Sequence, residues 1–140
     1  HIWVLYEAEE QEQILPFLEQ LGKQKKKVHT CVFVAEKKLP EFPDSVRVVH
    51  ALTDLNLFNI PSKEVLKSFI EQKADILIDL TRTQNHPMKY LMLQHPCSYK
   101  VGIKDSKVDL YDLSISVASR DDLKQMCKHI LFYLQAIRSE

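Results

Sequence analysis

The chain has 140 residues, which we expect to form one domain over residues 1–140, long enough to bury a core without disulfides or a metal. Its 19 basic and 19 acidic side chains balance, which argues against a role based on bulk attraction to nucleic acid or acidic lipid. Apolar residues make up 45% of the chain, yet no run of them reaches the ~18 residues of a membrane span, so we predict neither a nucleic-acid nor a membrane partner.

The cysteines and the N-terminus indicate the cellular compartment. Cys31, Cys97 and Cys127 are odd in number and widely spaced, which favours free thiols in a reducing cytoplasm. Cys31 lies in an apolar run and Cys127 on an apolar helix face, so both are predicted to be buried. We expect no signal peptide, because the first apolar run is short and acidic residues follow it. The sequence starts at His1 rather than at a methionine, which leaves open a preceding anchor or strand.

The first half of the chain begins with a short apolar run, Ile2–Leu5, which predicts a strand covered on both faces. A helix is expected from about Glu9 to Leu21, with Gly22 as its C-terminal cap. Pro16 predicts either a bend in this helix or a helix that begins nearer Leu15. Further apolar runs predict two strands, at residues 28–35 and 46–49. Residues 51–61 mix polar and apolar side chains without a clear period, which predicts an ordered loop.

The second half contains the strongest strand pattern, residues 75–80, which we expect at the centre of the sheet. A helix capped by Ser62 precedes this strand and extends to about Gln72. A short helix capped by Asn85 follows the strand and stops before Pro96.

Two more strands are predicted at residues 99–103 and 110–117. Only about six residues link them, too few for a parallel crossover, so we expect an antiparallel hairpin. Residues 119–122 approximate a capping box for a final helix. Its apolar stripe consists of Leu123, Met126, Cys127, Ile130, Leu131, Leu134 and Ile137.

This order of elements predicts a three-layer α/β/α sandwich. The sheet is expected to be Rossmann-like or flavodoxin-like and mostly parallel, with five to six strands and an antiparallel edge hairpin. Proteins of this class usually bind nucleotides through glycine-rich turns, where the backbone takes positive φ and approaches a phosphate. The two glycines, Gly22 and Gly102, do not lie between a strand and the following helix. We therefore expect a nucleotide-binding scaffold without the phosphate loop, and we predict no cofactor.

Residues 74–80, the segment Tyr99–Gly102 and the segment Thr53–Phe58 together resemble a family of small bacterial proteins of unknown function, found mostly in Bacteroidetes. This resemblance covers nearly the whole chain and implies no activity. Residues 74–116 are also distantly similar to the N-terminal half of heptosyltransferase-type glycosyltransferases. Those enzymes bind the sugar nucleotide mainly on a second domain, and residues 6–9 stand where they have a glycine-bearing turn. The likeness therefore does not imply a complete glycosyltransferase.

Ligands of open α/β sheets bind beyond the carboxyl ends of the strands, an edge that also gathers Glu7 and Glu36. The densest polar group follows the fourth strand. There, Arg82 suits an anion, the helix start offers backbone N–H groups, and a folded-back loop would pair an acid with a base. We predict as candidate ligand-binding residues Asp79, Thr81, Arg82, Asn85, His86 and, after the third strand, Asp54. The same residues suit an ordinary strand end, turn and helix cap equally well.

Two hypotheses for the function remain. The first is a non-catalytic module that binds a protein partner or a second copy, to which Phe132 and Tyr133 would offer apolar surface. The second is an enzyme or enzyme subunit that acts on an anionic small molecule, a sugar or nucleotide derivative. It requires Asp79 and Arg82 to be free of structural hydrogen bonds. We predict no catalytic residue and no metal ligand. Residues 95–97 fit a turn beside a half-buried thiol, and the lysines of residues 23–27 fit a solvated helix end.

Overall fold

The structure, a computed structural model, describes residues 1–24, 27–37, 41–43, 45–104, 110–116 and 123–138. Six strands form one parallel sheet in the order β3-β2-β1-β4-β5-β6. The strands are β1 (Ile2–Glu7), β2 (Val28–Val34), β3 (Val46–His50), β4 (Ile76–Asp79), β5 (Tyr99–Ile103) and β6 (Leu113–Ile115). A short 3-10 helix, η1 (Ala8–Glu10), leads into α1 (Gln11–Lys23), and the other helices are α2 (Lys63–Glu71), α3 (His86–Gln94) and α4 (Leu123–Arg138).

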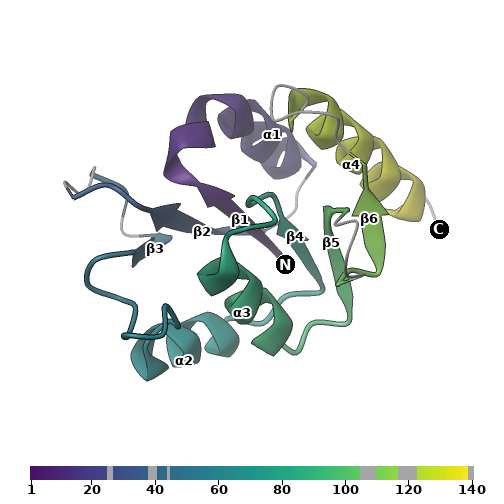
Figure 1. Ribbon diagram of the computed structural model, residues 1–140. Coiled ribbons are helices and arrows are strands. Elements are labelled where there is room, and N and C mark those ends of the chain that lie inside the picture. The colour runs from purple at the N-terminus through teal and green to yellow at the C-terminus, as the bar shows by residue number, and fades with distance from the viewer. Residues whose placement is uncertain (25–26, 38–40, 44, 105–109, 117–122, 139–140) are drawn as a thin grey trace.

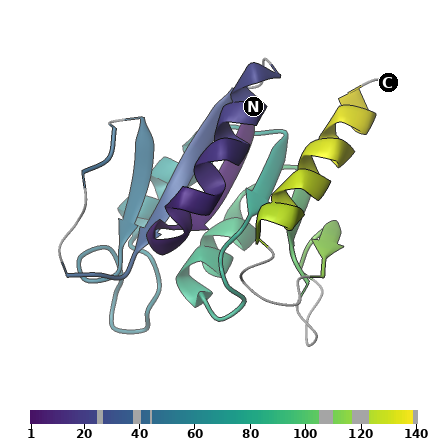
Figure 2. The same cartoon turned by 90° about the horizontal axis from the view of Figure 1, so that it is seen from above.

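The helices cover both faces of the sheet, α1 and α4 on one face and α2 and α3 on the other (Figures 1 and 2). Alternate residues of each strand point to opposite faces, so each central strand supplies two separate cores. In β1, Val4 packs under α1 and α4, whereas Trp3 packs against Phe69 of α2. The predicted layers and the predicted central position of β4 are therefore confirmed, as is the burial of Cys31 and Cys127.

Local sequence signals located most elements correctly. The Ser62 hydroxyl accepts a hydrogen bond from Val65 N at 3.3 Å, and the Asn85 amide oxygen accepts one from Met88 N at 3.3 Å, so both predicted caps are confirmed. The predicted capping box at residues 119–122 lies outside the described residues, as do the lysines at positions 25 and 26 and the side chain of Ile137.

The first helix begins close to its predicted start near Glu9, because η1 leads directly into it, but its C-terminal end differs from the prediction. It begins at Gln11 rather than near Leu15, and Pro16 lies inside it. Gly22 is not a left-handed cap, because neither of the two glycines, both of which are described, has positive φ. It belongs to the helix, which ends at Lys23 with Gln24 as the capping residue. The helix is therefore two residues longer at this end than predicted.

The predicted hairpin between the last two strands is wrong, because β6 pairs with β5 in parallel. The strand begins at Leu113 rather than at residue 110, which leaves a longer connection. Before β6 starts, the chain has already returned to the beginning of β5, where Asp112 N donates to Lys100 O at 2.8 Å. The ring of Tyr111 lies over Gly102 on the face of α2 and α3 and supplies apolar cover there.

This close approach makes Gly102 essential to the edge of the sheet. In Gly102→Ala the added Cβ would overlap the Tyr111 ring, and we expect a loss of about 1–3 kcal/mol in the free energy of unfolding. The matched control is Gly22→Ala, because, apart from its chain neighbours and the backbone of its own helix, no described atom lies within 4 Å of a Cβ added there. That variant should gain about 0.4–1 kcal/mol. Urea unfolding measures both values, and equal stabilities of the two variants would contradict the packing of Tyr111 on Gly102.

Candidate functional site

A cleft of about 420 Å³ opens at the carboxyl ends of β1, β2 and β4. It lies beside the point where the strand order reverses, between β1 and β4, which is the general position of ligand sites in open α/β sheets. The end of β1, the exit of β2, the loop after β3 and the start of α3 form its walls. The described lining residues are Glu7, Ala8, Glu9, Phe33, Val34, Ala35, Glu36, Asn59, Arg82, Gln84, Asn85 and Pro87.

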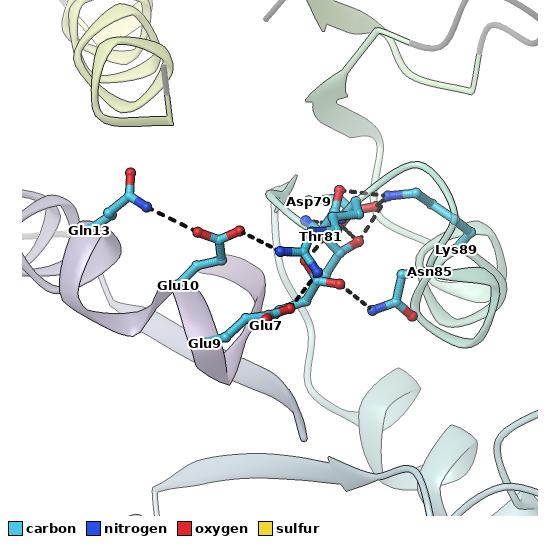
Figure 3. A network of polar contacts seen from close by, with 9 residues as sticks. Glu7, Glu9, Glu10, Gln13, Asp79, Thr81, Asn85 and Lys89 are labelled. Atoms are coloured by element: carbon cyan, nitrogen blue, oxygen red, sulfur yellow. Dashed lines mark hydrogen bonds and ion pairs between the residues drawn. The ribbon is translucent and has the colours of Figure 1, made fainter. Parts of the chain in front are cut away.

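Glu7, the last residue of β1, joins the two central strands at the base of the cleft (Figure 3). Its side chain is only 8% exposed and accepts a hydrogen bond from Arg82 N at 3.2 Å. The other carboxylate oxygen accepts one from the Asn85 side-chain amide at 3.0 Å. Because Asn85 also caps α3, one carboxylate holds both the exit of β4 and the start of the next helix.

Arg82 lies among carboxylates from the turn between β1 and α1. Its guanidinium approaches Glu7 at 3.8 Å, Glu9 at 2.5 Å and Glu10 at 3.5 Å. Gln13 of α1 orients the buried Glu10 through a hydrogen bond of 3.0 Å. These acidic side chains occupy the N-terminal end of α1, the position at which nucleotide-binding folds accept a phosphate. The positive charge of Arg82 is therefore already balanced within the protein.

Asp79, at the end of β4, is fully buried beneath this cluster. One carboxylate oxygen accepts hydrogen bonds from the backbone N and the hydroxyl of Thr81. The other accepts from Lys89 Nζ at 2.8 Å and from Tyr111 Oη at 2.7 Å. Lys89 Nζ also donates to Thr81 O at 3.1 Å and to the Thr81 hydroxyl at 2.8 Å, which uses all three of its protons. We refer to Asp79, Thr81, Lys89 and Tyr111 as the buried network.

The structure thus divides the predicted ligand-binding residues into groups. Arg82 and Asn85 line the cleft, whereas Asp79 and Thr81 belong to the buried network. His86 is exposed at the start of α3, so Asp79 and His86 do not form the acid–base pair that a folded-back loop would create. Asp54 lies after β3, where its carboxylate accepts a hydrogen bond from His50 N at 2.7 Å. Ligand binding by these residues stays a prediction.

The chain segment around Cys97 shows no sign of an activated nucleophile. Cys97 N donates to His95 Nδ1 at 3.1 Å, and the other ring nitrogen of His95 lies 2.9 Å from Gln72 O. Burial raises the pKa of the Cys97 thiol, whereas reactive cysteines have a lowered pKa. The first contact closes the turn before β5, and the second ties this turn to the end of α2.

Within the residues that the structure describes, no three His, Cys, Asp or Glu side chains gather in a way that would hold a metal ion. In the same part of the chain, no helix combines the length and the apolar character that a membrane crossing requires.

Residues 1–137 match a family of unknown function, DUF6913, and the chain belongs to this family. The predicted membership of a family without a known activity is therefore confirmed. Neither the curated proteins nor the solved structures provide a match to the chain. The bacterial source and the distant likeness to heptosyltransferases stay predictions.

Several residues that shape the site were not identified from the sequence. Lys89 and Tyr111 are typical of a helix surface and of a strand when taken alone. Glu9 and Glu10 fit the ordinary preference of acidic residues for a helix N-terminus. The sequence offered one signal for the buried network. Lys89 lies in an otherwise apolar stretch of α3, and a lysine needs a partner when such a helix is buried.

Lys89 provides a direct test of the buried network. In Lys89→Met the Asp79 carboxylate would lose its buried counter-charge, and we expect a loss of about 3–5 kcal/mol in the free energy of unfolding. The matched control is Lys67→Met, which removes an exposed pair with Glu71 and should cost about 0–1 kcal/mol. Urea unfolding at neutral pH compares the two. Similar losses would contradict the role of Lys89 as the counter-charge.

Proposed function

We propose that this chain is a non-catalytic binding module of Rossmann-like fold whose cleft takes a small ligand. The observation that carries this proposal is the position of the cleft at the carboxyl ends of the central strands. The strand order supports a Rossmann-like rather than a flavodoxin-like arrangement. Contacts within the protein hold the walls, so the cleft is formed before a ligand binds, as is usual for small-molecule sites.

The charges of the cleft favour a ligand that donates hydrogen bonds over a phosphate. Glu7, Glu9 and Glu36 line it together with Arg82, so carboxylates outnumber guanidinium groups among the described lining residues. An anion would have to displace the glutamates from Arg82 and would then lie close to them. An amine or a polyol meets carboxylate acceptors, while Phe33 and Pro87 offer apolar contact to its carbon atoms.

The enzyme hypothesis receives less support from the same geometry. Its requirement was that Asp79 and Arg82 be free of structural hydrogen bonds, yet Asp79 accepts from three side chains and Arg82 is paired with glutamates. A buried carboxylate with satisfied oxygens is a poor general base, because a substrate proton cannot reach it. A cytoplasmic location stays a prediction, supported by the free thiols of Cys31 and Cys127.

Calorimetric titration with spermidine, glucose and adenosine monophosphate tests the cleft. We expect saturable binding of spermidine, weaker binding of glucose, and no binding of the nucleotide. Ala35 is exposed and lines the cleft, so Ala35→Trp should fill the site and reduce spermidine affinity by roughly tenfold or more. The control is Leu93→Trp on α3, which is 49% exposed and does not line the cleft.

Three results would count against this ligand class. One is the absence of spermidine and glucose binding by the unmodified protein. Another is equal binding by Ala35→Trp. The third is tight nucleotide binding that Arg82→Ala removes, which would restore the anion hypothesis.

A further inference from the structure

The loop between β3 and α2 carries two large apolar side chains at its tip. Leu57 is 101% exposed, and Phe58, the next residue in the chain, is 82% exposed. We call these two residues the apolar tip. Exposed apolar side chains of this size that lie together are typical of a contact surface.

The apolar tip is held by a well-formed loop. The Asn56 side-chain oxygen accepts hydrogen bonds from Phe58 N at 2.8 Å and from Ile60 N at 3.1 Å. Asn59 N donates to Asn56 O at 3.0 Å, and Asn59 adopts a φ of 64°, which asparagine tolerates better than most residues. The predicted ordered loop is therefore confirmed. Because the loop is already ordered, little further conformational entropy is lost when the apolar tip makes a contact.

The base of the loop is attached to the wall of the cleft. Ala51 N donates to Val34 O at 2.9 Å, and His50 Nε2 lies 2.7 Å from Glu36 O. Val34 and Glu36 line the cleft, as does Asn59, the residue after the tip. The apolar tip and the acidic rim formed by Glu36 and Glu9 therefore belong to one surface at the carboxyl edge of the sheet. Both glutamates are exposed.

A surface of complementary character lies on the face of the molecule formed by α1 and α4. A groove of about 460 Å³ runs between α1 and α4, with an apolar lining from Pro16, Phe17 and Leu131. Lys124 and Lys128 also line it and are exposed, one helical turn apart on the same face of α4. We call this the basic groove. The views along both directions place α4 far from the loop after β3 (Figures 1 and 2), so one copy cannot fill its own groove.

We propose that the apolar tip of one copy of this chain docks into the basic groove of a second copy. Leu57 and Phe58 would lie in the apolar part of the groove, and Glu9 and Glu36 would face Lys124 and Lys128. The two surfaces differ, so the contact is head-to-tail, and a chain of copies keeps one unused apolar tip at one end and one unused basic groove at the other. This association adds to the proposed ligand cleft and does not depend on it, because it needs no ligand.

Sedimentation velocity with two exposed-surface variants tests the contact. The tip variant is Leu57→Ser with Phe58→Ser, and the groove variant is Lys124→Glu with Lys128→Glu. We expect the unmodified protein to associate with increasing concentration, and more weakly at high salt. Each variant alone should associate roughly tenfold or more weakly. An equimolar mixture should form a heterodimer, because the tip variant keeps an intact groove and the groove variant keeps an intact tip.

Controls separate this contact from other causes. Leu93→Ser and Lys67→Glu change exposed residues of the same kinds outside both surfaces and should sediment like the unmodified protein. A monomeric unmodified protein at the highest concentration would overturn the proposal. So would association that the tip variant retains, or a mixture of the two variants that stays monomeric while the unmodified protein associates. Spermidine titration of the tip variant tests the ligand cleft separately from the association. This variant should still bind spermidine even when it no longer associates.

Discussion

The buried carboxylate of Asp79 is the constraint on which the centre of this fold depends. A charge at the end of the central strand, on the face covered by α2 and α3, is tolerated only when it is paired and hydrogen-bonded. Lys89 brings α3 to it, and Tyr111 brings the connection between β5 and β6. Tyr111 can reach Asp79 because Gly102, the residue of β5 in register with Asp79, has no side chain. One ionic group thus links three separate segments.

The same arrangement determines the character of the cleft above it. With the exit of β4 held by the buried network, Arg82 and Asn85 meet Glu7 at the end of β1. The turn into α1 carries Glu9 and Glu10 in place of a glycine-rich loop, so the protein supplies its own negative charge at the helix N-terminus. The strand order is one that nucleotide-binding folds use, but carboxylates occupy the position at which those folds accept a phosphate.

The binding proposals use two neighbouring features of a chain from a family of unknown function. The cleft offers carboxylate acceptors within prearranged walls, and the loop next to it presents exposed apolar side chains. Both lie at the carboxyl edge of the sheet, where loops can vary without disturbing the two cores. A head-to-tail contact there would place the α4 surface of one copy beside the cleft of the next, so that association and ligand access share one edge.

The sequence by itself determined the elements, their order and the layered α/β class, because apolar periodicity and caps such as Ser62 and Asn85 act over a few residues. It also placed Glu7, Glu36, Arg82 and Asn85 at one edge, since the carboxyl ends of parallel strands meet there. Only the tertiary structure decided the direction of β6, the pairing of Asp79 with Lys89 and Tyr111, and the carboxylates around Arg82. These depend on contacts between segments far apart in the sequence, and no local pattern records which distant charge will neutralise which.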